Sequence, residues 1–519
     1  MKQLSKIIWG ILLIGVFSFA SCTHNFEEIN APKDQASEDD MNGDNYRTGA
    51  FYLKLQGQVI PESSGGYQHC ENLTGDVWGR FMMSNVKWKG KNFSEFSYDH
   101  VGWIDNPFNE LANFYPSFNE IRKSTNGEGV NYAWAKILRV AAMHRLTDLY
   151  GPLPYSQVES SNLYVGYDSQ ESIYKTMLQE LTEAAEELSK YVEQYPQATP
   201  MKAYDRVYSG DYAKWMRFAN SLKLRIAMRM RFVEPTLAKE MAEDAIKRGV
   251  ITSNEDNAAY QPAGTNNFWL IAQSWGDCRV AADLISYMGG YNDPRQSKYF
   301  DRSGFENVTY AGLRSATNAS DDAYGKYSKA LVYQNDKIIW LTAAEVAFLR
   351  AEGTLIGWDM GGGTSEENAQ AFYEEGINLS FAQWGAGSAT SYINDDTSQP
   401  KDYIDPNNGA ENANAGSSIT IKWENGNKEK NFERIITQKW IALWPIGHEG
   451  WCEYRRTGYP YFFPLVRPAS DNKYNNLKVA NRLPFATTEY FNNPDNVKAA
   501  VSLLGGEDDF ATKMWWQKK

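Results

Sequence analysis

The stretches "NYAWAKILRVAAMHRLTDLYG" at residues 131–151 and "SQESIYKTMLQELTEAAEELSKYV" at residues 169–192 decide the fold class. In both, apolar side chains recur at spacings of three and four, which places them on one face of a helix. The first stretch ends at Gly151-Pro152, a common helix stop. We predict that the two helices pack against each other as an antiparallel hairpin. Their apolar faces contain Trp134, Ile137, Leu138, Ala141 and Leu149 in the first stretch, and Ile173, Met177, Leu181, Ala184, Leu188 and Val192 in the second.

The same pattern returns further along the chain. Residues 210–230 and 235–249 predict a second pair of helices, in which Pro235 begins and Gly249 ends the second member. Thr342 is followed three residues later by Glu345, a capping-box spacing that predicts the start of another helix. Its partner follows the loop "GWDMGGGTSEEN" at residues 357–368, and residues 431–445 predict one more helix.

Repeated helical hairpins favour a mainly α fold, a tetratricopeptide-like scaffold in which no segment carries the complete 34-residue consensus. Long stretches rich in Gly, Asn and Ser separate the hairpins, at residues 60–128, 252–340 and 385–430. Loops of this length are uncommon unless they bind a ligand or contain small elements of their own. We therefore expect a helical scaffold that carries long irregular loops.

The N-terminus predicts export and lipid attachment. Lys2 and Lys6 precede an uncharged apolar run at residues 7–20, which is shorter than the approximately 20 apolar residues that span a membrane. The quartet Phe19-Ala20-Ser21-Cys22 resembles the bacterial lipobox, in which the cysteine thiol is acylated. We predict a signal peptide at residues 1–21, a lipidated Cys22 that begins a flexible tether at residues 22–45, and a single domain at residues 46–519. The alternative is a plain secreted protein with a chance cysteine.

The charge balance argues against nucleic acid as a partner. Loss of residues 1–21 would remove two lysines from the 52 basic residues and leave 50 basic against 64 acidic side chains, with no long basic run. Attachment to a membrane would then depend on the lipid, at ~0.8 kcal/mol for each buried methylene. Cys70, Cys278 and Cys452 lie far apart and form no CxxC pair, so a structural zinc site is not expected and one disulfide at most can form.

Catalytic motifs are absent from the sequence. There is no GxSxG elbow, Walker A loop or GxGxxG motif. There is also no HExxH motif, because position 452, where His448-Glu449 would need a second histidine, is a cysteine. Paired carboxylates such as Asp395-Asp396, or Glu449 with Glu453, suit glycoside hydrolysis, yet an acidic chain contains such pairs by chance. We predict no catalytic residue, no metal site and no cofactor.

Aromatic residues in the Gly- and Asn-rich stretches point to carbohydrate. The chain has 17 Trp, and an indole face beside polar side chains suits a sugar ring, which has C–H groups on its face and hydroxyls at its edge. The alternative for each tryptophan is a place in the core. The predicted stacking platforms are Trp78, Trp88, Trp103 and Trp275, and the predicted partners of the sugar hydroxyls are Asn267, Asp277 and Arg279.

Five stretches in the same order resemble the SusD/RagB-like outer-membrane lipoproteins. They are "LTDLYGPLPYSQV" at 146–158, "YNDPR" at 291–295, "AAEVAFLRAEGTLIGW" at 343–358, "RIITQKWIALWPIGHEGWCEYRRTGYP" at 434–460 and "NRLPFATTEYFNN" at 481–493. The resemblance covers the chain from Cys22 onwards. We interpret the C-terminal signature as structural, because Arg455 and Arg456 are suited to bidentate pairing with buried acids.

The resemblance implies a tetratricopeptide-like lipoprotein on the outer leaflet of a Gram-negative outer membrane. It also implies a partner, a SusC-like TonB-dependent transporter, to which the protein delivers glycans or other oligomers. The family's ligand residues vary, so none is transferred to this chain by position. Three alternatives stay open: a tethered glycoside hydrolase, a peptide-binding lid of the same transporter type, and a scaffold whose aromatics are all core.

Overall fold

The computed structural model describes residues 45–84, 96, 101–158, 164–469 and 471–518. Helices predominate, and the contacts and sites below lie within the unit Thr48–Lys519. The predicted signal peptide, Cys22 and nearly all of the predicted tether lie outside the described residues, as does Trp88. Among the described residues, no helix is both long enough and apolar enough to span a bilayer.

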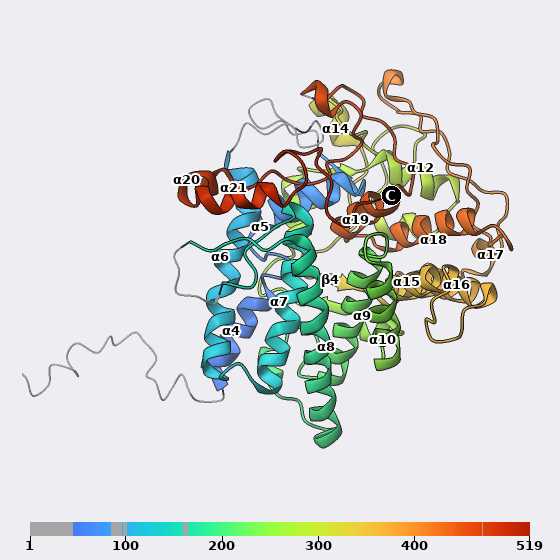
Figure 1. Ribbon diagram of the computed structural model, residues 1–519. Helices are drawn as coiled ribbons and strands as arrows, with labels where there is room; N and C mark the ends of the chain where they lie inside the picture. Colours follow the sequence, from blue (N-terminus) through green and yellow to red (C-terminus); the bar gives the residue numbers. More distant parts are fainter. Residues whose placement is uncertain (1–44, 85–95, 97–100, 159–163, 470, 519) are drawn as a thin grey trace, which may run out of the picture. The chain divides into compact units, whose positions relative to one another are not determined.

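The predicted helix pairs are confirmed. The first pair is α7 (Gly129–Tyr150) with α8 (Gln170–Gln194), and the second is α9 (Tyr212–Arg229) with α10 (Pro235–Arg248). Figure 1 shows these four helices side by side, and each packs on the next. The third pair is α15 (Ala343–Leu355) with α16 (Glu366–Gln383), and α18 (Lys428–Ala442) packs on both.

Local capping chemistry sets the helix ends. Ser169 accepts a hydrogen bond from the Ser172 amide at 3.2 Å and begins α8. Gly151 follows α7 with a φ of 85°, a left-handed value that a residue with a Cβ rarely adopts. Thr342 caps α15 by accepting from the Glu345 amide at 3.2 Å, so the helix start predicted from their spacing is confirmed. The Glu345 carboxylate binds a buried arginine, as described below.

The stretch at 60–128 contains more regular structure than its composition indicates. It carries α5 (Ser64–Tyr67), the π-helix η2 (Gln68–Asp76) and the 24-residue helix α6 (Val101–Ser124), which contains Pro107 and Pro116. The prolines conceal α6 in the sequence because proline inside a helix costs about 3 kcal/mol or more. Its aromatic face compensates, since Phe114 and Phe118 are fully buried.

Two short antiparallel ribbons join segments that are distant in sequence. Met82 and Met83 of β1 (Met82–Met83) pair with β3 (Arg279–Val280). The second ribbon pairs β2 (Ala258–Tyr260) with β4 (Ile338–Leu341). The first ribbon matters for function, because it fixes the chain just after Asp277 against the chain just after η2.

The stretches at 252–340 and 385–430 contain the small elements that their length predicts. These and the remaining elements are α4 (Tyr46–Gln56), η4 (Lys202–Tyr204), η5 (Asn254–Asp256), α11 (Asn267–Trp269), η6 (Leu270–Trp275), α12 (Ala282–Gly290), α13 (Gln296–Tyr299), α14 (Asp321–Lys326), α17 (Thr390–Ile393), η7 (Gly409–Glu411), α19 (Gly447–Thr457), η8 (Asn472–Tyr474), α20 (Thr487–Asn492) and α21 (Pro494–Ser502).

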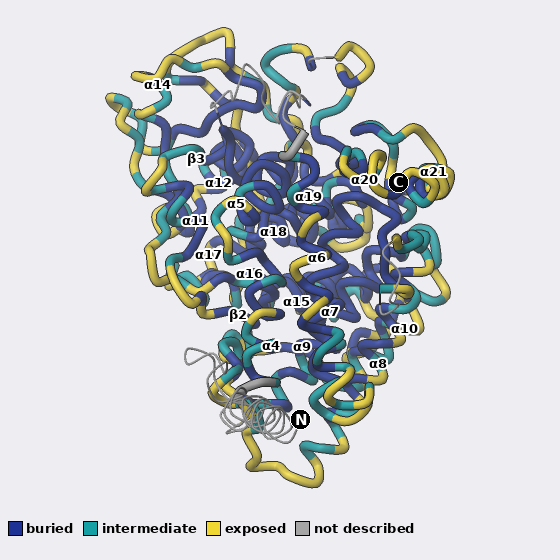
Figure 2. The backbone as a smooth tube through the Cα atoms, turned by 90° about the vertical axis from the view of Figure 1, so that its left-hand side faces the viewer, coloured by how far each residue is buried: buried dark blue, intermediate teal, exposed yellow. Residues whose placement is uncertain are grey.

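The core surrounds α18 and α19, the helices of the C-terminal signature. Figure 2 shows the backbone buried along these helices, whereas exposed residues concentrate in the connections between elements. Trp440 and Trp451 are fully buried there, and the Trp440 indole donates to the Gly79 carbonyl at 2.8 Å. This bond joins α18 to the chain just after η2, 361 residues earlier.

Candidate ligand-binding surface

Trp275 is the most exposed of the three predicted platforms that lie in the described residues. It is the last residue of η6, which continues directly from α11, and the side chain of Asn266 caps α11 by accepting from the amides of Phe268 and Trp269. Gly276 ends η6 in the left-handed conformation, with a φ of 74°. The indole of Trp275 is held at a helix end with 47% of its surface exposed.

Asp277 lies beside this platform and connects it to η2. Its carboxylate accepts a hydrogen bond from the Gln68 amide at 3.1 Å. Burial raises the pKa of Asp277, and the hydrogen bond from Gln68 opposes that rise. Asp277 is only partly buried, so the group is available to a hydroxyl as well as to Gln68.

Trp103 reaches the same region from another element. It lies on the first turn of α6 and not on a loop, and its ring centroid is 5.5 Å from that of His69. His69 follows Gln68 in η2, and its Nδ1 lies 3.1 Å from the Asn106 amide nitrogen of α6. Trp103 is partly buried against the core. Trp103 contacts His69, the neighbour of Gln68, and Gln68 binds Asp277, two residues after Trp275. We call these five residues the Trp275 strip.

Three other predicted ligand residues, Trp78, Asn267 and Arg279, are buried, so their predicted place at the surface is wrong. Trp78 and Asn267 show this most simply. Trp78 is 1% exposed and packs on Trp451, with ring centroids 4.9 Å apart. The Asn267 amide donates to the Glu62 carbonyl at 2.7 Å and ties α11 to the chain before α5. Both side chains have their contacts inside the protein.

Arg279 is also structural. Its guanidinium donates to the carbonyls of Gly276, Cys278 and Tyr324 at 2.9, 2.8 and 3.1 Å. It also lies over the Tyr324 ring, 4.3 Å from its centroid. A guanidinium bound to three carbonyls shapes the turn after Trp275, and its burial leaves it little access to a ligand.

Gln68 and His69 belong to the strip, and the sequence analysis did not identify them. They lie in "SGGYQHCENLTGD" at residues 64–76, which has neither helical nor alternating apolar periodicity. The stretch forms α5 and then the π-helix η2, a rare element for which sequence patterns provide no clear signal. Only the contacts with α6 and Asp277 reveal their position.

A second cluster of charged residues is buried among the helices. Arg225 of α9 binds both carboxylate oxygens of Glu345, at 2.7 and 2.6 Å. Arg229, one turn later, binds Asp148 of α7 and Glu449 of α19. Burial alone would raise the pKa of Glu449, but Arg225 and Arg229 outweigh burial and hold it well below its ordinary value. We call this cluster the buried charge network.

The C-terminal signature extends this network. Arg456 makes a bidentate pair with Glu352, at 2.5 and 2.7 Å, and also binds Glu453 at 2.5 Å. Lys439 contacts the other oxygen of Glu453 at 3.0 Å. The predicted pairing of Arg456 with buried acids is confirmed, because both Glu352 and Glu453 are buried.

For Arg455 the predicted pairing is wrong. Its guanidinium donates to the carbonyls of Asp148 and Asn481, both at 2.8 Å, and lies over the Trp451 ring 3.3 Å from its centroid. The two side chains point in different directions, because adjacent residues such as Arg455 and Arg456 project from different faces of a helix.

The carboxylates considered for catalysis are engaged elsewhere. Glu449 and Glu453 are buried in the charge network. Asp395 accepts from the amides of Thr397 and Ser398, both at 2.8 Å, and Asp396 lies 3.1 Å from Lys422. Asp396 lines a surface cleft that Asp395 does not line.

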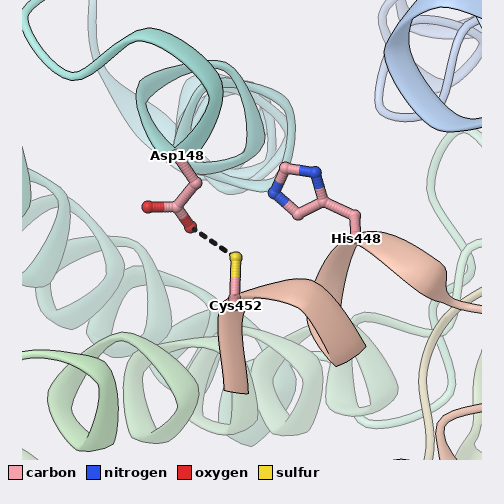
Figure 3. A group of neighbouring side chains, drawn as sticks. All are labelled: Asp148, His448 and Cys452. Carbon is pink, nitrogen blue, oxygen red and sulfur yellow. Dashed lines mark hydrogen bonds between the residues drawn. The ribbon is translucent and has the colours of Figure 1, made fainter. Parts of the chain in front are cut away.

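One group of side chains in the described part of the chain has the spacing of a metal site. Asp148, His448 and Cys452 each offer a ligand atom, all within 4.8 Å of one another, and Figure 3 shows His448 and Cys452 on one helix facing Asp148. Burial raises the pKa of the Cys452 thiol to about 12, so the thiol keeps its proton and donates to Asp148 at 3.7 Å. Arg455 lies 3.0 Å from the sulfur and Arg229 binds Asp148, and these two positive charges oppose a cation.

Comparison with known proteins covers nearly the whole chain. Residues 28–517 match the family described as "SusD-like: Susd and RagB outer membrane lipoprotein". A SusD homolog from Bacteroides uniformis is 39% identical, with a TM-score of 0.83 over 91% of this chain and 100% of that chain. A SusD homolog from Bacteroides thetaiotaomicron is 36% identical, with a TM-score of 0.84 over 91% of this chain and 99% of that chain.

A third similar structure has a ligand in its description. It is a chitin-binding SusD homolog from Flavobacterium johnsoniae, 35% identical, with a TM-score of 0.85 over 91% of this chain and 99% of that chain. No curated protein matches this chain.

Proposed function

This chain belongs to the SusD/RagB family of outer membrane lipoproteins, and from that premise we propose that it captures glycans or other oligomeric nutrients at the cell surface. We further propose that it passes them to a SusC-like TonB-dependent transporter. The chitin-binding relative from Flavobacterium johnsoniae supports a glycan as the ligand. The observation that carries the proposal is the exposed indole of Trp275 beside the partly buried carboxylate of Asp277.

The Trp275 strip has the chemistry of a sugar platform. A sugar ring that stacks on the Trp275 indole would gain about 0.5–1.5 kcal/mol beyond burial of its surface. Asp277 can then accept a hydrogen bond from a hydroxyl at the edge of that ring. One or two such contacts give micromolar to millimolar affinity, which suits a protein that must release its ligand to a transporter.

The proposed attachment is a lipid on Cys22, with residues 1–21 removed and residues 22–45 as a tether to a domain at residues 46–519. Cys22→Ala is expected to move the protein from the outer membrane fraction to a soluble or retained form, measured by fractionation and by incorporation of labelled fatty acid. Unchanged labelling in Cys22→Ala would contradict it. Cys70→Ala is the control, because Cys70 is buried and has no free access to an acyl transferase.

The protein is proposed to bind its ligand without cleaving it. The support is that Glu449 and Glu453 are held in ion pairs and that Asp395 accepts backbone hydrogen bonds. Incubation with the polysaccharides that bind should release no shorter product. Release of product would favour the alternative of a tethered glycoside hydrolase.

Affinity electrophoresis and calorimetry against chitin, starch, xylan and mannan test the binding itself. Trp275→Ala should weaken binding of the active glycan about threefold to tenfold. Tyr195→Ala is the matched control, because Tyr195 at the end of α8 has a similar exposure of 49%. If no glycan binds and a peptide does, the peptide-binding alternative replaces this one. If Trp275→Ala binds normally, the strip is not the platform.

A further inference from the structure

The surface cleft that Asp396 lines has a volume of about 710 Å³. Its lining comes from residues 396–424, from the first half of α18 and from Tyr461. The volume lies in the range of about 300–1,000 Å³ that is typical of small-molecule sites. No residue of the Trp275 strip lines this cleft, so the two places can be altered separately.

One wall of the cleft is the irregular segment at residues 416–422, which the interior of the protein holds in place. The hydroxyl groups of Tyr291 and Tyr373 donate to the carbonyls of Ile419 and Ile421, at 3.0 and 2.6 Å. Both tyrosines are buried, so these two bonds attach the segment to the core. The wall is therefore positioned by contacts behind it.

The outer part of the same segment has hydrogen-bonding groups that the protein does not use. Gly416, Ser417 and Ser418 line the cleft, and their backbone amides and carbonyls have no hydrogen-bond partner within the described residues. Gly416 and Ser418 are exposed. Donors and acceptors are thus available to a ligand along this wall.

Glu433 of α18 supplies a further acceptor. One of its carboxylate oxygens accepts a hydrogen bond from the Ser417 hydroxyl, whereas the other oxygen has no hydrogen-bond partner within the described part of the chain. Glu433 is only partly buried, and this second oxygen is not among the buried unpaired atoms, so solvent reaches it. Burial raises the pKa of Glu433, and the bond from Ser417 opposes that rise.

Tyr461 gives the cleft an accessible aromatic ring. The residue is 40% exposed, and its ring centroid lies 5.2 Å from that of Tyr459 with an angle of 88° between the rings. The Tyr287 hydroxyl donates to the Tyr461 carbonyl at 3.2 Å. Gly416 packs closely here, since a Cβ on it would lie 3.0 Å from the Tyr461 Cβ. These contacts fix the position of Tyr461 and leave part of its surface open.

The charges around the cleft favour an uncharged ligand. Lys422 lies 3.1 Å from Asp396, and Glu424 lies 3.4 Å from Lys430 and 3.2 Å from Arg434. In all, three acidic and three basic side chains line the cleft, so it carries no net charge. An anion or a cation would therefore meet a group of its own sign beside any partner.

We propose that this cleft is a second carbohydrate site that takes one or two sugar units, with a sugar ring stacked on Tyr461, Glu433 accepting from a hydroxyl and the amides of residues 416–418 donating to sugar oxygens. The proposal rests on the proposed function, because it assigns the same ligand class to a second place. A sugar combines C–H groups for the ring with uncharged hydroxyls that both donate and accept. A purely apolar ligand would leave the amides and the carboxylate without partners.

Calorimetry with N,N′-diacetylchitobiose, cellobiose and maltose tests the proposal in the full folded protein. For the disaccharide that binds, the wild type should show two sites. Tyr461→Ala removes the ring and should weaken one site about twofold to tenfold. Glu433→Gln keeps an oxygen that accepts from Ser417 but removes the charged acceptor, and should weaken that same site about twofold to tenfold.

Two matched controls should leave both sites unchanged. Tyr195→Ala removes a tyrosine that is 49% exposed and does not line the cleft. Glu374→Gln alters a partly buried glutamate that accepts from the Gln370 side chain at 2.7 Å, as Glu433 accepts from Ser417, and that also lies outside the lining. Thermal unfolding of each variant shows that it is folded.

Trp275→Ala separates this proposal from the function on which it rests, because it should weaken only the other site. A single site that Trp275→Ala weakens and Tyr461→Ala leaves intact overturns the second site and leaves the proposed function in place. Absence of all saccharide binding in the wild type overturns both. Binding of a peptide such as trialanine that Tyr461→Ala abolishes, with no saccharide bound there, overturns the ligand class.

A crystal soaked with the disaccharide gives an independent test. Difference density beside Tyr461 and Glu433 supports the second site. An empty cleft beside an occupied Trp275 strip contradicts it.

Discussion

The buried charge network and the Trp275 strip both combine acidic and aromatic residues, but the first stabilises the fold and the second is proposed to bind a ligand. Around Glu449 each acid is paired with a guanidinium and shielded from water. Around Asp277 the amide of Gln68 is the side-chain hydrogen-bond donor in the described part of the chain, and Trp275, two residues earlier, is 47% exposed. Burial therefore decides whether an acid beside a tryptophan stabilises the fold or remains available to a ligand.

The largest expected effect comes from removing an acid from the buried charge network. Glu449→Ala leaves Arg225 and Arg229 short of a counter-charge inside the protein, and removal of one partner from a buried pair costs about 3–5 kcal/mol. The measurement is the free energy of unfolding in urea.

The control for that substitution is Asp322→Ala, which removes the partner of Lys326 from an ion pair in which the Asp322 side chain is 84% exposed. We expect it to leave the stability nearly unchanged. Equal effects at Glu449 and Asp322 would show that the buried charge network does not hold the helices together.

A pH titration sharpens the comparison. Burial raises the pKa of Glu453, but Arg456 and Lys439 outweigh it and lower that pKa to about 2. The pKa of a glutamate in the unfolded chain is about 4.3. Ionised Glu453 therefore stabilises the fold fully above that pH, and the contribution is lost as the pH falls through the folded pKa.

We therefore expect the difference in unfolding free energy between the wild type and Glu453→Gln to shrink as the pH falls from about 5 towards 2. Urea titrations at a series of pH values measure this difference. A constant difference would mean that Glu453 is not ionised in the folded protein.

A matched pair of substitutions compares two tryptophans directly. Trp78→Phe leaves a cavity beside Trp451 and should lower the free energy of unfolding by roughly 0.5–3 kcal/mol. Trp275→Phe makes the same chemical change at an exposed site and should alter it by less than about 0.5 kcal/mol. Thermal and urea unfolding measure both; a larger loss at Trp275 would show that its indole supports the fold.

The smallest expected effect concerns Asp277. Asp277→Asn keeps an oxygen that accepts from Gln68 and removes the charge, so glycan affinity should fall by a factor of about two to three, the lower end of one net hydrogen bond. Calorimetry measures this affinity. Unchanged affinity would remove Asp277 from the site and leave Trp275 as the principal contact.

Much of the fold was predictable because it depends on local pattern. The apolar spacing, the stop at Gly151 and the ends at Pro235 and Gly249 indicate α7, α8 and α10 within about two residues of where they lie. The resemblance to the SusD/RagB family is confirmed as well. Helix α6 was missed because Pro107 and Pro116 suggest an interrupted chain, and only packing of its aromatic face shows otherwise.

The sequence by itself determined the helical hairpins, the family and the structural role of Arg456, since these depend on periodicity, caps and ordered motifs. It also selected Trp275 and Asp277 as candidate ligand contacts, because they lie in a stretch rich in Gly and Asn. Tertiary structure alone decided that Trp78, Asn267 and Arg279 are buried and that Gln68 joins the strip. The physical reason is that exposure depends on contacts between segments up to hundreds of residues apart, and residue type carries no record of those contacts.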